Sequence, residues 1–330
     1  DQMPGWLASA ATVLPLKHAI DIARPLMLGR VPDGIVLHVA LVLGASFAYL
    51  LLLFALAWWA DRRAAAGRSV IDNAWVYTLS IGVYCTAWTY FGSIGRAATS
   101  GLWFLPIYLG PTLAMLLAGS LVKRMVRIAH QQRITSIADF IASRYGGSRA
   151  LAALVTLIAL VGLLPYIALQ LKAIAGGLAL LAGAPASAAA PWWQDSTFMI
   201  ALALAGFTLA FGTRHLDAAE RHEGLVAAIA LESVVKLVAF VAVGVFVCWG
   251  LFSSPAQIFE RAAAQPELAS LLRLSGSAGA DSRFAGGQWF ALTLLAGLSL
   301  LFLPRQFQVM VVENGDERHI GCAIWAFALY

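Results

Sequence analysis

Two ionisable side chains, Glu232 and Lys236, lie four residues apart inside an otherwise apolar stretch at 224–252. Residues at this spacing share one face of a helix, and an acid N-terminal to a base is the favourable order for an ion pair. Ionisable groups inside apolar helices mark ion pathways or proton relays, or else pair with one another. The spacing therefore indicates a structural ion pair, with a proton relay as the alternative.

A second candidate region is the run at 82–95, where glycines mix with hydroxyl and aromatic side chains in an apolar stretch. Helices with this composition can break, and transporters bind ions and small polar solutes at broken helices, where freed carbonyls coordinate cations. Small residues also allow close helix packing without any ligand. The run predicts either a binding site or a packing surface.

A third candidate region surrounds Pro165, which removes one helical hydrogen bond from the apolar stretch at 150–171. Tyr166 and Gln170 follow it, four residues apart and therefore on one helix face. They could together contact a polar ligand beside the run at 82–95. The alternative is a proline kink whose polar neighbours satisfy the freed backbone groups.

Other chemistry is not indicated by the sequence. The three cysteines, Cys85, Cys248 and Cys322, lie singly in apolar segments and lack disulfide or metal-ligand spacing. No phosphate-binding glycine loop, nucleophile elbow or metal-binding histidine pair is present in the sequence. We therefore expect no catalytic centre and no bound cofactor in these 330 residues.

The elements that position these residues follow from composition, since 61% of the 330 residues are hydrophobic and only 12% are charged. A soluble domain has about twice this charge. Uncharged stretches of about 20 residues can cross a bilayer. The sequence predicts an all-α polytopic membrane protein with seven spans, at 34–60, 74–95, 97–122, 150–171, 196–213, 224–252 and 284–304.

Charge between the spans predicts their orientation. The loops after the first, third and fifth spans carry clusters of lysine and arginine, whereas the intervening loops are poor in them. Basic loops stay in the cytoplasm, which places the N-terminus outside. The net charge of +5 reflects these short clusters, so we expect a lipid bilayer as partner and no nucleic acid.

Three further segments complete the expected organisation. Residues 1–32 are broken by prolines and charges and predict a surface-lying segment before a membrane domain at 33–330. Residues 134–146 predict a short helix, with Ser136 and Asp139 as a capping box, whose apolar side lies on the membrane surface. An eighth apolar stretch begins at Ile320 and reaches Tyr330, so we expect the span to continue beyond this residue.

Five ordered motifs carry a resemblance to a known family. The chain resembles the sodium/solute symporters, and within them the symporter-like sensory domain at the N-terminus of CbrA-type sensor histidine kinases. The motifs are TAWTYFGSIGRAATSGLWFLPIYLGPTL (86–113), RITSIADFIASRYG (133–146), LVGLLPYIALQLKAIA (160–175), FGTRHLDAAERHEGLVAAIALESVVKLVAF (211–240) and LFLPRQFQVMVVE (301–313).

The resemblance implies a LeuT-like helix bundle in which the second and seventh spans are both broken. It implies that backbone carbonyls near Gly82 and Cys85 form half of a sodium site. Several symporters have an acidic residue in this broken helix, whereas 86–92 contains none. The solute contacts that the resemblance implies are Thr86, Trp88, Thr89, Tyr90, Tyr166, Gln170, Phe302 and Phe307.

The resemblance also implies a function. The chain would be the transporter-like sensory domain of a two-component sensor histidine kinase in the bacterial inner membrane, binding or transporting an amino acid such as histidine. A kinase region beyond Tyr330 would bind ATP and Mg²⁺ and act on a cytoplasmic response regulator. The alternatives are a stand-alone sodium/solute symporter without signalling, and a scaffold whose former transport site only packs.

Overall fold

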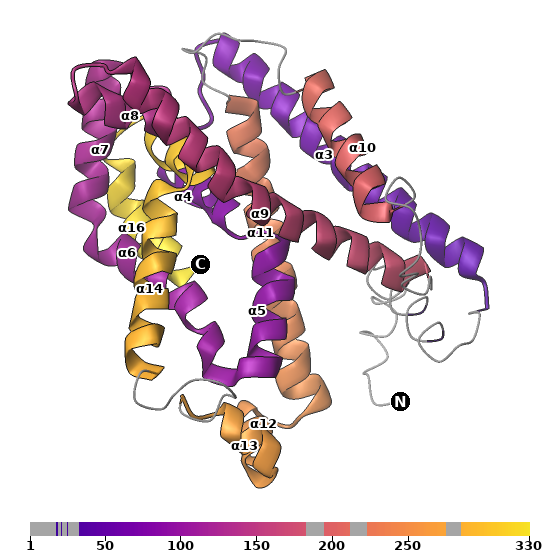
Figure 1. Ribbon diagram of the computed structural model, residues 1–330. Helices are drawn as coiled ribbons and strands as arrows, with labels where there is room; N and C mark the ends of the chain where they lie inside the picture. The colour runs from indigo at the N-terminus through magenta and orange to yellow at the C-terminus, as the bar shows by residue number, and fades with distance from the viewer. Residues whose placement is uncertain are drawn as a thin grey trace. The chain divides into compact units, whose positions relative to one another are not determined.

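The computed structural model (Figure 1) describes residues 18, 21, 25, 33–182, 195–211, 223–274 and 285–330. In this part of the chain all regular structure is helical, which confirms the all-α expectation. Of the surface segment expected at 1–32, only His18, Asp21 and Pro25 lie among the described residues.

The chain divides into two compact units. One contains Asp1–Ala55 and Leu164–Asp217, and the other contains Leu56–Leu163 and Ala218–Tyr330. The boundaries fall inside α3 (Ile35–Ala65) and α9 (Arg149–Ala182). The unit with residues 164–217 also contains α10 (Ser196–Phe211).

The remaining described elements belong to the second unit. They are α4 (Ala74–Ile81), η1 (Gly82–Tyr84), α5 (Ala87–Ser100), η2 (Gly101–Phe104), α6 (Pro106–Leu117), α7 (Gly119–Gln132), α8 (Ile137–Arg144), α11 (Glu223–Val245), η4 (Phe246–Leu251), α12 (Pro255–Ala264), α13 (Pro266–Leu271), α14 (Ala285–Phe302), α15 (Pro304–Phe307), η5 (Gln308–Val312) and α16 (His319–Leu329).

Three described helices are long and apolar enough to cross a membrane: Ile35–Ala65, Arg149–Gly177 and Glu223–Leu251. Two bent pairs raise the number to five if each is one span. These pairs are Gly92–Phe104 with Pro106–Leu117, bent by 65°, and Gly286–Phe302 with Pro304–Val312, bent by 51°. By length and composition the chain is a membrane protein, with three to five spans among the described residues where the sequence predicted seven.

The expected boundary between the second and third spans is wrong. We expected a loop at 92–101 that contains Arg96, but α5 continues through Arg96 to Ser100 and only Gly101 turns the chain. The chain turns at Gly101, whose φ of +55° favours glycine, and a Cβ there would collide with the Leu271 carbonyl. The turn is therefore set by backbone geometry at Gly101 rather than by the charge at Arg96.

The core of the second unit forms where α4, α6, α7, α14 and α16 meet (Figure 1). Helices α6 and α14 approach closely at Gly110 and Gly297. A Cβ added to Gly110 would lie only 2.7 Å from the Gly297 nitrogen. Fully buried Met115, Leu300 and Met310 fill the adjacent space. Small residues at such crossings let helix backbones pack closely in membrane proteins.

Helix α8 begins and ends as its sequence predicts, but its apolar side faces protein. The Ser136 side chain accepts the Asp139 N–H, and the chain leaves the helix through Gly146 at a φ of +67°. Ile137 is buried in the core, and the Phe140 ring lies 5.4 Å from the Phe307 ring. The expected membrane-surface face is thus a packing face, because the core offers Phe307 as a partner.

The N-terminal end of α11 contacts the last turns of α3 and the segment that follows it. The Gly224 N–H donates to Asp61 Oδ1 at 2.6 Å, and the buried Glu223 carboxylate accepts the Ser69 hydroxyl at 2.9 Å. Carboxylates beside the first turn of a helix satisfy its unpaired N–H groups and favour its dipole. These contacts hold this end of α11 against α3, and α11 carries Glu232 and Lys236 further along.

Candidate functional site

The helix expected at 74–95 is broken near its middle. Helix α4 ends at Ile81, η1 adds one tight turn, and Cys85 and Thr86 are extended before α5 begins at Ala87. Thr86 and Thr89 cap α5 reciprocally, with the Thr86 N–H donating to Thr89 Oγ1 at 3.1 Å. A capping box satisfies two unpaired N–H groups and stabilises a helix start. The residues around the break, Thr86 and Thr89, therefore favour the interruption of the helix.

A second break separates α14 from α15. Leu303 is extended, with a ψ of 128°, and Pro304 occupies the first turn of α15. Proline has no N–H to donate, so it suits a helix start and interrupts a continuous helix. The chain bends by 51° at this point. The second apolar stretch is therefore interrupted near its middle, whereas the seventh is continuous through α14 and the chain breaks at its end.

Side chains fasten the two breaks together. The buried Gln306 amide donates from Nε2 to the Ile81 carbonyl at 3.1 Å, where α4 ends. One helical turn earlier on α4, the Tyr77 hydroxyl donates to the Met310 carbonyl at 2.7 Å. Backbone carbonyls freed at helix breaks need such partners inside a membrane. The two interrupted helices thus form one polar region within an apolar unit.

The charged pair of α11 reaches the first break. Glu232 Oε1 and Lys236 Nζ are 2.6 Å apart, and Lys236 Nζ also donates to the Cys85 carbonyl at 3.0 Å. Both charged side chains are between one third and two fifths exposed. An ammonium group therefore lies at the extended residue where the resemblance implies a sodium ligand.

The two carbonyls nearest the implied sodium position each accept a hydrogen bond in this structure. The Gly82 carbonyl accepts the Cys85 N–H at 2.9 Å, which closes the turn of η1. The Cys85 carbonyl accepts the Lys236 ammonium. A carbonyl oxygen has two lone pairs, so one hydrogen bond leaves it able to bind a cation, and the sodium site stays a prediction. The Lys236 ammonium beside the Cys85 carbonyl opposes a second positive charge there.

Gly82 itself packs tightly against two neighbouring helices. A Cβ at this position would lie 2.6 Å from Ser233 Oγ and 3.3 Å from the Tyr330 ring. The Tyr330 hydroxyl donates to the Ser233 carbonyl at 3.2 Å, so these groups are held in place. Close packing, one of the two interpretations of the glycine-rich run, therefore accounts for Gly82.

A hydroxyl cluster that the sequence did not signal extends the polar surface along α5. The Tyr108 hydroxyl of α6 lies 2.7 Å from Ser93 Oγ and donates to the Thr89 carbonyl at 3.3 Å. The sequence does not predict this cluster, because its residues meet only after the turn at Gly101 brings α6 back beside α5. The side chains of Trp88 and Tyr90 lie outside the described part of the structure.

The other implied solute contacts are distributed over both units. Tyr166 and Gln170 lie on α9 in the unit with residues 164–217, half-buried and one turn apart, and α9 continues through Pro165. In the second unit, Phe302 is half exposed at the end of α14, whereas Phe307 is fully buried in the core. Phe307 thus packs the second break instead of lining an open surface.

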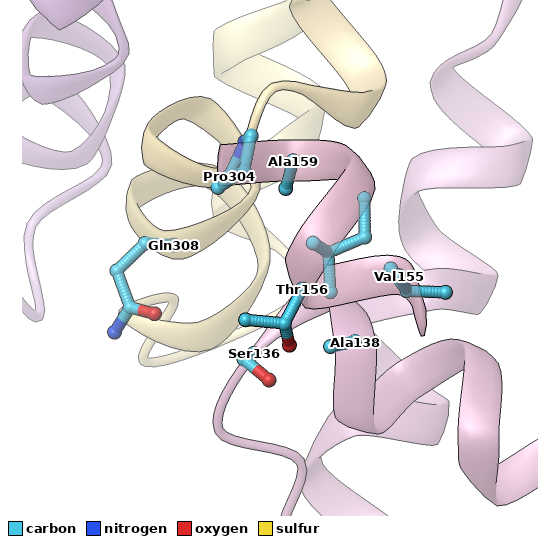
Figure 2. A pocket seen from close by; sticks show the side chains of 8 residues that line it. Ser136, Ala138, Val155, Thr156, Ala159, Pro304 and Gln308 are labelled. Carbon is cyan, nitrogen blue, oxygen red and sulfur yellow. The ribbon is translucent and has the colours of Figure 1, made fainter. Parts of the chain in front are cut away.

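A pocket of about 190 Å³ lies beside the second break (Figure 2). Its wall combines the α8 cap, one face of α9 and the start of α15, and Figure 2 shows Ala159 next to Pro304. One water occupies about 30 Å³ of liquid, so the pocket has room for a small solute. The lining residues are Ser136, Ile137, Ala138, Val155, Thr156, Ala159, Pro304 and Gln308.

One group of residues in the other unit has metal-ligand types that the sequence analysis missed. His18, Asp21 and His38 bring their ligand atoms within 4.8 Å of one another, and the two histidine Nδ1 atoms are 2.8 Å apart. The fold creates this pair from residues 20 positions apart. The three-residue spacing of His18 and Asp21 was the available signal, but it is too common to indicate a site alone.

Comparison with known proteins gives no relative: no family model matches the chain, nor does any curated protein or solved structure.

Proposed function

We propose that this chain binds a small polar solute, an amino acid with histidine as the first to test, between its two interrupted helices. The observation that carries the proposal is the Gln306 to Ile81 hydrogen bond, which holds the two breaks side by side. Interrupted helices that meet within the membrane are where secondary transporters bind solutes. In keeping with the resemblance, we propose that the domain serves a sensor histidine kinase.

The charged groups at the first break suit a zwitterion. Lys236 offers an ammonium group for a carboxylate, and Glu232, 2.6 Å away, offers a carboxylate for an ammonium group. An amino acid can insert its two charges between them while leaving no charge unpaired. Unpaired charges are costly in a membrane, so binding that preserves charge pairing is favoured. Since Lys236 already holds the Cys85 carbonyl, the proposed binding is independent of sodium.

Signalling follows if the solute favours one arrangement of the broken helices. Ligand occupancy shifts an equilibrium only when the ligand binds the two states with different affinity. The reading frame after Tyr330 tests the kinase part of the proposal. Histidine phosphotransfer and ATP-binding domains would support it, whereas a stop after further spans would favour a transporter.

Equilibrium binding of labelled L-histidine to the purified chain in lipid nanodiscs tests the solute site. We expect saturable binding that other amino acids compete for to different degrees. The variant Glu232→Gln/Lys236→Met should lose this binding, because both groups that pair with the zwitterion are gone.

The matched control is Arg127→Gln/Glu317→Gln, which removes an exposed ion pair of 3.0 Å elsewhere in the same unit. It should bind like the unchanged chain. If the α11 variant folds and binds as tightly as this control, or if no amino acid competes, the proposed site is wrong.

A further inference from the structure

The end of α3 forms a basic, aromatic hollow that the proposed function does not use. Arg62 Cζ lies 4.0 Å from the centre of the Trp58 ring, and Arg63 Cζ lies 5.0 Å from that of Trp59. With Ala66 and Arg68, these residues line a hollow of about 630 Å³. All six residues belong to the second unit.

The three guanidinium groups of this hollow lack an acidic partner among the described residues. Asp61 is their nearest neighbour in the sequence, but its carboxylate accepts the Gly224 N–H at 2.6 Å. Glu223 is likewise occupied by Ser69 and Val70. Three positive charges around one hollow attract a multiply oxygenated anion, which arginine binds with paired N–H donors.

The position of the hollow along α3 indicates where this anion comes from. The preceding part of α3 is apolar and exposed, and it ends with the two half-exposed tryptophans Trp58 and Trp59. Tryptophan next to arginine at the end of an apolar span is typical of the headgroup level of a bilayer.

We infer that the hollow binds the phosphate of an anionic phospholipid. Arg62, Arg63 and Arg68 hold the phosphate, while the tryptophans contact the glycerol region and keep two of the guanidinium groups oriented. The same segment anchors α11 through Asp61, so a lipid bound here also stabilises the start of α11. This inference does not depend on the proposed solute site.

Native mass spectrometry of the purified chain in detergent, titrated with phosphatidylglycerol or phosphatidylcholine of the same acyl chains, tests the inference. We expect phosphatidylglycerol to bind on the order of a hundredfold more tightly, since each of the three basic residues near an anionic headgroup contributes about 1 kcal/mol. The variant Arg62→Gln/Arg63→Gln/Arg68→Gln should lose this preference. Should it fail to fold, Arg62→Gln alone should weaken phosphatidylglycerol binding about fivefold.

The matched control, Arg124→Gln/Arg133→Gln/Arg144→Gln, removes the same charge from exposed arginines of another basic segment, formed by α7, α8 and the turn between them. It should retain the lipid preference. Equal loss in both triple variants would show general attraction to negative charge and overturn a specific site. Displacement of phosphatidylglycerol by millimolar inorganic phosphate would assign the hollow to free phosphate and likewise overturn the lipid.

Discussion

Removing the charges of α11 one at a time should be more damaging at Lys236 than at Glu232. Lys236→Met leaves the Glu232 carboxylate without its partner at 2.6 Å and the Cys85 carbonyl without its donor at 3.0 Å. Glu232→Gln leaves Lys236 with the Cys85 carbonyl and a neutral amide oxygen. The double variant leaves no charge behind, and only the Cys85 carbonyl is without a donor.

The structure sets the size of these effects on the free energy of unfolding. Breaking a fully buried ion pair costs about 3–5 kcal/mol and breaking an exposed one less than about 1 kcal/mol. Both side chains are partly exposed, so the orphaned Glu232 costs about 2 kcal/mol. The missing donor at Cys85 adds about 1 kcal/mol. We expect losses of about 3 kcal/mol for Lys236→Met, and about 1 kcal/mol for both Glu232→Gln and the double variant.

Equilibrium unfolding in mixed micelles, followed by tryptophan fluorescence, measures these differences through a double-mutant cycle. The coupling energy should be about 3 kcal/mol, which requires the double variant to be more stable than Lys236→Met. A double variant as unstable as Lys236→Met, or two single variants with equal and additive losses, would refute the structural pairing.

Three further predictions concern the two breaks. Gly82→Ala should lower the melting temperature, because its Cβ would lie 2.6 Å from Ser233 Oγ, and adding Ser233→Gly should restore most of the loss in a thermal shift assay. Gln306→Leu should cost about 2 kcal/mol in the free energy of unfolding by leaving the buried Ile81 carbonyl unpaired, whereas an unchanged value would show that water replaces the amide. Replacing sodium by choline should leave L-histidine affinity unchanged, and a tenfold loss would show that an ion displaces Lys236 from its carbonyl.

Local chemistry made part of this site predictable. The four-residue spacing of Glu232 and Lys236 is sufficient to bring their charges together on any helix, and the structure places them 2.6 Å apart. The interruption near Cys85 also follows from nearby residues, since Thr86 and Thr89 favour a new helix start. The ion pair and the helix start each depend on a few neighbouring residues, so both can be predicted from the local sequence.

Contacts between distant residues were not predictable in this way. The Lys236 ammonium meets a carbonyl 151 residues away, and Gln306 meets one 225 residues away. Every residue has the same backbone carbonyl group, so the sequence does not show which carbonyl accepts a hydrogen bond from a given side chain. The prediction that the apolar face of α8 contacts the membrane surface was wrong for a similar reason. An apolar helix face can pack against lipid or against a buried ring such as Phe307, and the sequence alone does not distinguish the two.

The glycine contact between α6 and α14 determines which parts of the second unit can move. With a Cβ-free Gly110 opposite Gly297, the two backbones interlock, and neither helix can slide without a collision between main-chain atoms. We therefore expect the two helices to move together. On the same basis, we expect a rearrangement on ligand entry to occur at the extended residues Cys85, Thr86 and Leu303, where the helices are already interrupted.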